Sequence, residues 1–203
     1  KFKIDLWHNR PYFPRELLPW PEGSTQVDAT ITWENPPTSV FFEMKYGADL
    51  SPKTAGDSGD HGYPSDQLIR NARVGLLETG WFQQERLFDV EPRDFVLILV
   101  GPDKGNRLVK KYRDPKRLLK AIPHSDLLPQ LPRTPFIGEL MFSDIIAVLA
   151  KQRRWFTRPE RQDVDDLTSY LEYKQARVPA KWTGWHQLRH EKMEHGGDGV
   201  VPD

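Results

Sequence analysis

The sequence predicts an α/β domain with a mixed central sheet flanked by helices and a helical extension on its C-terminal side. Three features indicate this fold class: two strand-like segments between residues 25 and 46, a capped amphipathic helix over 65–80, and an apolar run over 94–101. Strands that alternate with helices along a chain favour a sheet with helices packed on it. With 203 residues the chain is long enough for one large core and short for two.

The first two strand-like segments are predicted to form an antiparallel hairpin. Apolar and polar residues alternate in TQVDATITW, residues 25–33, as they do in a half-buried strand. Its apolar side chains share one face: Val27, Ala29, Ile31 and Trp33. The turn residues ENPPT follow, and SVFFEMKY, residues 39–46, has the composition of a return strand.

This hairpin brings two acidic residues to opposed positions. If Trp33 pairs with Thr38 around a four-residue loop, the same register sets Asp28 directly opposite Glu43, with side-chain roots about 5 Å apart. Like charges at opposed positions destabilise a sheet, and a bound cation is the simplest compensation.

Local signals bound the next helix and strand. Residues 47–64 are rich in Gly, Ser, Asp and Pro, which indicates a long loop. The helix begins at a Ser65 or Asp66 cap and ends near Gly80, with an apolar stripe formed by Leu68, Ile69, Ala72 and Leu76. DFVLILVG, residues 94–101, is apolar throughout, which is typical of a central strand covered on both faces.

The rest of the chain is predicted to be mainly helical. Residues 106–122 are basic and partly helical in pattern, and amphipathic helices are expected over 136–155 and 164–177. The predicted organisation has three parts: an α/β core over 1–105, a helical extension packed on that core over 106–185, and a flexible tail over 186–203.

Composition narrows the classes of function. The 29 basic residues balance the 29 acidic ones, so attraction to a polyanion requires a local patch. The chain has no cysteine, which excludes disulfides, thiolate metal sites and a thiol nucleophile. The longest apolar run, Phe95 to Val100, is too short to span a bilayer, and the first residues contain no signal-peptide core. A cytoplasmic protein without a membrane partner is therefore expected.

Three charged residues form the pattern Asp28, fourteen residues, Glu43-x-Lys45, spread over two neighbouring strands and followed by a helix and an apolar strand. In this order the pattern resembles the PD-(D/E)xK nuclease superfamily, also called restriction-endonuclease-like, over roughly residues 25–100. Val27 stands where the name-giving proline would be. The resemblance implies a restriction-endonuclease-like core of a helix, three strands, a helix and a fourth strand.

The resemblance also implies a metal site and a set of catalytic residues. Asp28, Glu43 and the backbone carbonyl of Met44 would bind Mg²⁺, for which Mn²⁺ would substitute, because a hard cation prefers oxygen ligands. Lys45 would orient the attacking water or stabilise the transition state, and Gln67 on the following helix would assist. Asp28, Glu43, Lys45 and Gln67 are thus the expected catalytic residues. Members commonly add an acidic residue from a helix before the first strand; Glu16, or a residue upstream of Lys1, is the candidate.

The implied substrate is nucleic acid, by analogy DNA. Arg70 lies on the same helix as Gln67 and is expected to bind a phosphate, as are Lys110 and Lys111. The two lysines belong to a basic segment that also contains Lys104, Arg107, Arg113, Lys116, Arg117 and Lys120. A homodimer or a larger assembly is compatible with this interpretation.

Three alternatives remain open from the sequence. The Glu-x-Lys pattern alone is compatible with a solvated face of an ordinary hairpin. A nuclease-like domain without turnover would still bind nucleic acid. A structural subunit of a larger assembly would use exposed aromatic anchors, for which Trp155, Phe156 and Trp182 are candidates.

Overall fold

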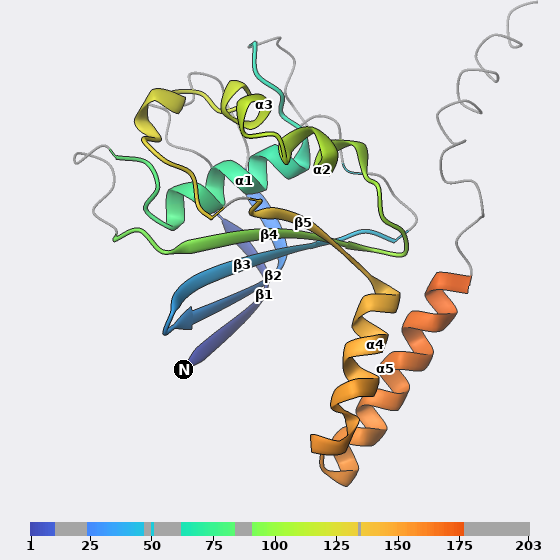
Figure 1. Ribbon diagram of the computed structural model, residues 1–203. Coiled ribbons are helices and arrows are strands. Elements are labelled where there is room, and N and C mark those ends of the chain that lie inside the picture. The colour runs from blue at the N-terminus through green and yellow to red at the C-terminus, as the bar shows by residue number, and fades with distance from the viewer. Residues whose placement is uncertain (11–23, 47–49, 51–61, 84–90, 134, 177–203) are drawn as a thin grey trace, which may run out of the picture.

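The computed structural model describes residues 1–10, 24–46, 50, 62–83, 91–133 and 135–176. In these residues the fold is α/β, with a five-stranded mixed sheet in the order β1-β2-β3-β4-β5 (Figure 1). The strands are β1 (Phe2–Arg10), β2 (Thr25–Glu34), β3 (Pro37–Met44), β4 (Asp94–Gly101) and β5 (Ile137–Met141). β2 pairs antiparallel with both β1 and β3, and β3, β4 and β5 run parallel. The predicted class, a mixed sheet flanked by helices, is confirmed.

The β2–β3 hairpin has the predicted register. Trp33 pairs with Thr38, and the pair Glu34 and Pro37 continues the ladder, so the turn contains two residues where four were expected. On its other side β2 pairs with β1, a strand that the sequence analysis did not assign. Apolar residues do alternate there with polar ones, and those apolar side chains are exposed: Phe2, Ile4 and Leu6.

Helix α1 (Gln67–Glu78) covers one face of the sheet, as Figure 1 shows. Its N-terminus is capped by Asp66, whose carboxylate accepts the backbone N–H of Ile69 at 3.0 Å. The helix ends at Glu78 with Thr79 as its C-cap, and Gly80 follows with a φ of 77°, a conformation that glycine adopts without steric cost. The predicted apolar stripe is fully buried against the sheet: Leu68, Ile69, Ala72 and Leu76.

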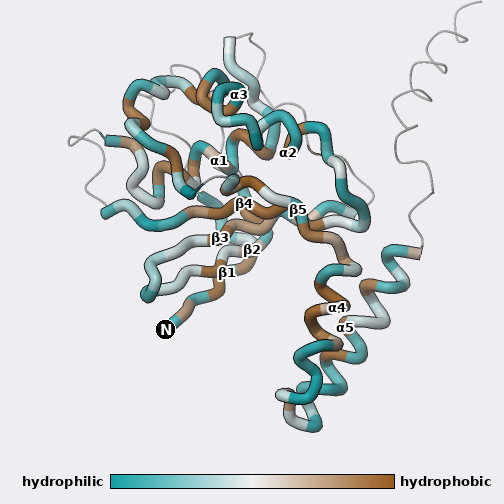
Figure 2. The backbone as a smooth tube through the Cα atoms, in the orientation of Figure 1, coloured by the Kyte–Doolittle hydropathy of each residue, from teal (hydrophilic) through white to brown (hydrophobic). Residues whose placement is uncertain are grey.

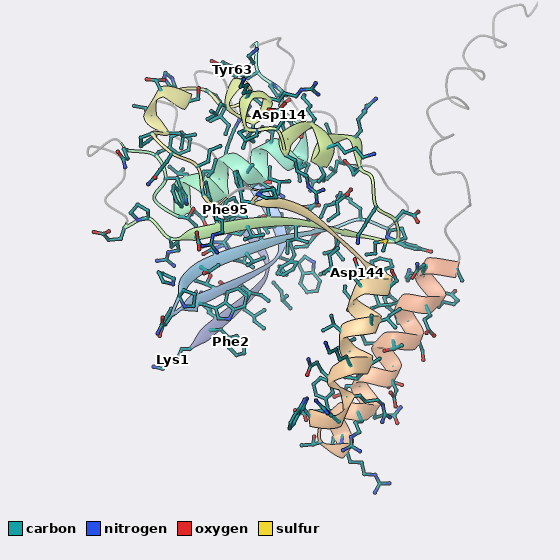
Figure 3. All side chains as sticks on the ribbon, in the orientation of Figure 1. Lys1, Phe2, Tyr63, Phe95, Asp114 and Asp144 are labelled. Carbon is teal, nitrogen blue, oxygen red and sulfur yellow. The ribbon has the colours of Figure 1, made fainter. Side chains whose placement is uncertain are left out.

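A glycine brings α1 into close contact with the sheet. A Cβ atom at Gly75 would lie 1.9 Å from Cζ of Phe95, so the helix can approach β4 this closely only without a side chain there. Phe95, labelled in Figure 3, packs edge-on against Phe41 with ring centroids 5.1 Å apart. Gly75 therefore lets α1 pack directly on the Phe95 ring.

The core extends beyond the boundary predicted at residue 105. Short helices α2 (Arg107–Tyr112) and α3 (Pro115–Lys120) lie on the same face as α1, and Val109, Tyr112 and Leu118 are buried in the same cluster. A single 3-10 turn (Ser125–Leu127) follows. The segment predicted as a helical extension packed on the core thus contains helices whose buried side chains join the cluster around α1, and it also contains a strand of the sheet, β5.

The helix predicted over 136–155 is wrong in its first residues. Ile137–Met141 form β5, which pairs with the otherwise open edge of β4, and α4 (Phe142–Gln152) begins only afterwards. A short apolar segment is compatible with either a strand or a buried helix, and pairing with β4 satisfies its backbone groups. Figure 2 shows apolar residues along both β4 and β5.

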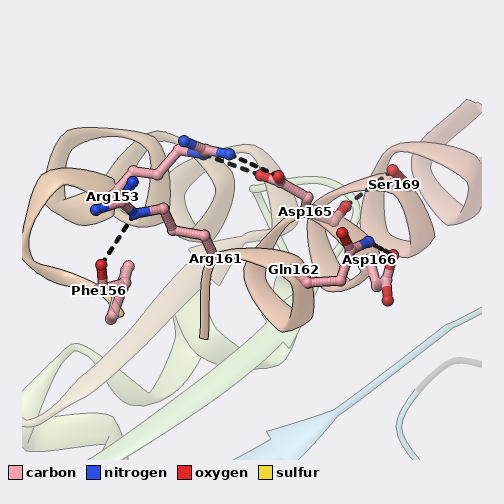
Figure 4. A network of polar contacts seen from close by, with 7 residues as sticks. All are labelled: Arg153, Phe156, Arg161, Gln162, Asp165, Asp166 and Ser169. Atoms are coloured by element: carbon pink, nitrogen blue, oxygen red, sulfur yellow. Dashed lines mark hydrogen bonds and ion pairs between the residues drawn. The ribbon is translucent and has the colours of Figure 1, made fainter. Parts of the chain in front are cut away.

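Two helices follow the last strand of the sheet. After α4 come a 3-10 turn (Arg153–Trp155) and α5 (Arg158–Ala176), and the two helices project away from the sheet. They attach through a second apolar cluster centred on Val100, Phe142 and Leu171. In Figure 4 Arg153 joins the carboxylate of Asp165 through two hydrogen bonds, at 3.0 and 2.7 Å.

Two further expectations concern the C-terminal part of the chain. Trp182 and the predicted tail over 186–203 lie outside the described residues. Within the described ranges, no helix combines the length and the apolar character needed to cross a bilayer.

Candidate active site

The candidate site lies where β2 and β3 meet the first turn of α1. Glu43 is the next-to-last residue of β3, and its side chain points towards α1 with only 1% of its surface exposed. A carboxylate is rarely buried without partners, because it loses its hydration. The contacts of Glu43 therefore define what the site contains.

Three side chains donate hydrogen bonds to the Glu43 carboxylate. Oε1 accepts from Nε2 of Gln67 at 2.7 Å and lies 2.8 Å from Nζ of Lys45. Oε2 accepts from Nδ2 of Asn71 at 2.9 Å. Gln67 and Asn71 come from successive turns of α1, whereas Lys45 follows directly on β3. The helix and the strand thus compensate the buried charge together.

Asp28 lies beside this cluster at the end of the β2–β3 ladder. The last pair of the ladder joins Ala29 to Phe42, and Asp28 and Glu43 are the next residues beyond it on the two strands. Beyond this point a side chain, and not a backbone carbonyl, accepts the next hydrogen bond: Oδ2 of Asp28 accepts the N–H of Met44 at 2.7 Å. The structure therefore places the two carboxylates as neighbours, in the arrangement that the hairpin register predicts.

The electrostatics of the site work against a charged Glu43. Burial is the largest cause and raises the pKa of Glu43 above its ordinary value, and the nearby charge of Asp28 raises it further. The Lys45 ammonium and the Asn71 amide act in the opposite direction but do not cancel the effect of burial. A buried carboxylate whose pKa is raised, with a second carboxylate beside it, favours the uptake of a positive charge, whether a proton or a cation.

The donor atoms present suit a hard divalent cation. Asp28 and Glu43 supply carboxylate oxygens and Met44 a backbone carbonyl, the ligand types that Mg²⁺ prefers together with several waters. A group of three or more His, Cys, Asp or Glu side chains that could hold a metal does not occur among the described residues. Glu16, the candidate for a third acid, lies outside them.

Lys45 is held in place at both its backbone and its side chain. Its N–H donates to the carbonyl of Val100 on β4 at 2.8 Å, which continues the parallel β3–β4 pairing past the end of the strand. About a quarter of its side chain is exposed, 25%, whereas Glu43 is buried. Lys45 therefore connects the buried carboxylate with the solvent-facing side of the site.

The other predicted site residues fall into two groups. Gln67 contacts Glu43 directly, as described above. Arg70, half-buried on the same helix, is not among the donors to Glu43 in the described part of the chain. Lys110 is exposed on α2, and Nζ of Lys111 lies 3.2 Å from the hydroxyl of Tyr112, so neither lysine contacts the acidic pair.

The basic helix α2 is nevertheless connected to the first turn of α1. The buried hydroxyl of Tyr112 donates to Oδ2 of Asp66 at 2.5 Å, and Asp66 caps α1 immediately before Gln67. Burial and the Asp66 carboxylate both raise the pKa of Tyr112 above its ordinary value, so the phenol remains a donor. Lys110 and Lys111 thus project from a helix that is bonded to the element carrying Gln67.

Two polar residues at the site were missed by the sequence analysis. Asn71 donates to Glu43, and Oγ1 of Thr25 lies 2.6 Å from Oδ1 of Asn71. The spacing of Gln67 and Asn71 was a usable signal, because residues four apart share one face of a helix. Thr25 had no such signal, because its contact depends on how α1 crosses β2.

The chain was compared with protein-family models, curated proteins and solved structures. No protein-family model, curated protein or solved structure matches the chain. The functional interpretation therefore depends on the contacts of Asp28, Glu43, Lys45 and Gln67.

Proposed function

We propose that the protein is a metal-dependent nuclease with a restriction-endonuclease-like core that hydrolyses phosphodiester bonds in DNA. One observation carries the proposal: the buried carboxylate of Glu43 lies beside Asp28 and is bonded to both Lys45 and Gln67. A solvated hairpin face would leave such groups exposed and separate. We expect the protein to act in the cytoplasm.

The residue types support a division of roles. Asp28, Glu43 and the carbonyl of Met44 would hold Mg²⁺ or Mn²⁺. A cation held there would supply two effects: it would lower the pKa of a coordinated water and neutralise charge on the phosphoryl oxygens. Lys45 keeps Glu43 in place and carries a partly exposed ammonium, which would stabilise the negative charge of the transition state. Gln67 orients the Glu43 carboxylate through Oε1.

The surface next to the site supports a polyanionic substrate. Along α2 and α3 basic side chains are exposed, namely Arg107, Lys110, Arg113, Lys116, Arg117 and Lys120. Because the protein has no net charge, this concentration of positive charge is a local feature. Lys110 and Lys111 would bind backbone phosphates, as would Arg70 on α1.

Cleavage assays test the proposal directly. The purified chain is incubated with end-labelled single-stranded DNA, duplex DNA and RNA, with Mg²⁺, Mn²⁺ or a chelator. We expect metal-dependent cleavage of DNA that is abolished by Glu43→Gln and by Lys45→Ala. Glu78→Gln is the matched control, because Glu78 is also a partly buried acid paired with a basic side chain, Arg10. Cleavage that survives Glu43→Gln would refute the assignment.

A second candidate function is a nuclease-like module that binds DNA without cleaving it. The observation that favours it is the acidic pair without a third acid among the residues described. This candidate predicts DNA binding at low salt and no cleavage with any divalent cation. A structural subunit, the remaining alternative, predicts no DNA affinity; its candidate anchor Trp155 is 71% exposed.

A further inference from the structure

A second buried polar pair lies behind the Glu43 carboxylate. Asn71 on α1 has no exposed surface, and Thr25 at the start of β2 is 2% exposed. The Thr25 hydroxyl oxygen lies 2.6 Å from Oδ1 of Asn71, and Nδ2 of Asn71 lies 2.9 Å from Oε2 of Glu43. Buried polar groups are costly unless they are bonded, so a chain of three requires an explanation.

The direction of each hydrogen bond in this chain is determined. Nδ2 of Asn71 donates to Oε2 of Glu43, as it must when Glu43 is the ionised, metal-binding carboxylate, because that form only accepts. The carbonyl oxygen of Asn71 then faces Thr25 and also only accepts, so the Thr25 hydroxyl must donate. Thr25 thereby decides which end of the Asn71 amide meets Glu43.

The two carboxylate oxygens of Glu43 differ in how many further hydrogen bonds or metal contacts they can accept. Each carboxylate oxygen has about two positions at which it can accept a bond. Oε1 already interacts with Gln67 and Lys45, whereas Oε2 accepts only from Asn71 among the residues that the structure describes. Oε2 is therefore the oxygen with an open position.

We infer that Thr25 and Asn71 are positioning residues that orient Glu43 so that Oε2 is the oxygen that binds the divalent cation. This inference rests on the proposed function, because it specifies how the same metal site is built. The hydrogen bond from Asn71 holds the carboxylate plane, and Thr25 holds Asn71. Both act through Glu43 and touch neither the metal nor the substrate.

The locations of the two residues suit this role. Thr25 lies on β2 three residues before Asp28, and Asn71 lies one helical turn after Gln67. The pair therefore connects the strand of one acid to the helix that contacts the other. The contact of Gly75 with Phe95 holds the same helix against the sheet. A rigid second layer of this kind is what a metal ligand needs to keep its orientation.

Mn²⁺ binding to the full chain tests the inference without depending on cleavage. Affinity is measured by titration calorimetry and by the Mn²⁺ electron paramagnetic resonance signal, for the unaltered protein, Thr25→Val, Thr25→Ser and Asn71→Ala. Loss of an outer-layer partner is expected to weaken metal binding about 10–100-fold, in both Thr25→Val and Asn71→Ala. Thr25→Ser keeps the hydroxyl and should restore the affinity.

Thr79→Val is the matched control. Thr79 is buried at the end of the same helix, where its hydroxyl donates to the carbonyl of Gly75 at 2.6 Å. This variant loses a buried hydroxyl away from Glu43, so its Mn²⁺ affinity should not change. Circular dichroism confirms that each variant is folded, and if Asn71→Ala unfolds, the Thr25→Val and Thr25→Ser pair still decides the outcome.

The results separate this inference from the proposed function. If the unaltered protein binds Mn²⁺, Glu43→Gln does not, and Thr25→Val binds normally, the inference is overturned while the metal site stands. Equal weakening in Thr25→Val and Thr25→Ser would also overturn it, because packing and not the hydroxyl would be responsible. If the unaltered protein and Glu43→Gln both fail to bind Mn²⁺, the proposed function and the inference fall together.

Discussion

The side-chain amide of Gln67, in the first turn of α1, donates to Oε1 of the buried Glu43 at 2.7 Å. This contact joins residues 24 positions apart and ties the helix to the end of β3. Gln67, which the sequence predicted as a site residue, therefore contacts one of the two acids directly. Several consequences of the site and of the packing beneath it can be measured.

Removing the Gln67 amide should reduce activity more than stability. In Gln67→Ala, Oε1 of Glu43 keeps Lys45 but loses one donor, so we expect cleavage to fall about 10–100-fold. Single-turnover kinetics with the DNA substrate measure the effect. Gln162→Ala is the control, because Gln162 bonds Asp166 on the exposed surface of α5. Equal activity in the two variants would contradict a role for Gln67.

Asp28 should have a structural as well as a chemical role. Its Oδ2 accepts the N–H of Met44, and Asp28→Ala removes that acceptor. We expect the free energy of unfolding to fall by about 1 kcal/mol in Asp28→Ala. Asp28→Asn keeps an acceptor oxygen and should be closer to the unaltered protein in stability, yet equally inactive. Urea denaturation of the metal-free proteins compares the two, and a more stable Asp28→Ala would contradict this account.

Gly75 should tolerate no side chain. A methyl group there would meet the Phe95 ring at 1.9 Å, so either the ring or the helix must move. We expect Gly75→Ala to lower the free energy of unfolding by about 1–3 kcal/mol, the usual cost of overpacking. Displacement of α1 would also move Gln67 and Asn71 away from Glu43.

The control for that substitution is Gly138→Ala in β5. No atom lies within 4 Å of a Cβ added at Gly138, so a methyl group fits there. Urea denaturation should show a clear loss of stability for the helix variant and little change for the strand variant. Similar stabilities would mean that Phe95 moves aside without cost.

Glu78 should make the protein less stable as the pH rises. Burial raises its pKa above the ordinary value of 4.5, and the attraction of Arg10 does not cancel that effect. The unfolded chain therefore releases this proton more readily than the folded one. The contribution of Glu78 is fully present below pH 4.5 and is lost as the pH rises through the raised pKa.

Thermal unfolding as a function of pH tests this assignment. The glutamine in Glu78→Gln cannot ionise. The difference in melting temperature between this variant and the unaltered protein should stay constant below pH 4.5 and change as the pH rises through the raised pKa of Glu78. A constant difference at all pH values would show that the pKa of Glu78 is not raised. Glu43, whose pKa is also raised, is present in both proteins and cancels in the comparison.

The lysines of α2 should contribute to DNA binding through charge alone. Each phosphate contact that is lost should reduce the slope of log affinity against log salt by about 0.9 on duplex DNA. We expect this change in Lys110→Ala and in Lys111→Ala, measured by fluorescence anisotropy with Glu43→Gln as the background to prevent cleavage. Lys151→Ala, an exposed lysine on α4, is the control. An unchanged slope would remove α2 from the DNA interface.

Short-range periodicity was sufficient to predict the hairpin and the meeting of its two acids. Alternation along 25–33 and 39–46 assigns side chains to faces, and pairing of Trp33 with Thr38 leaves one register. The Asp66 cap and the apolar stripe likewise bounded α1. These features depend on residues close together in the chain, so the sequence by itself determined them.

Tertiary packing decided the rest. Ile137–Met141 became a strand because β4 offered an unpaired edge, which no local pattern reveals. Thr25 meets Asn71, and Asn71 meets Glu43, only because Gly75 lets α1 cross the sheet at close contact with Phe95. Side chains far apart in the sequence find one another through the distance and angle between packed elements. That geometry arises from the whole core, so no single segment of the sequence encodes it.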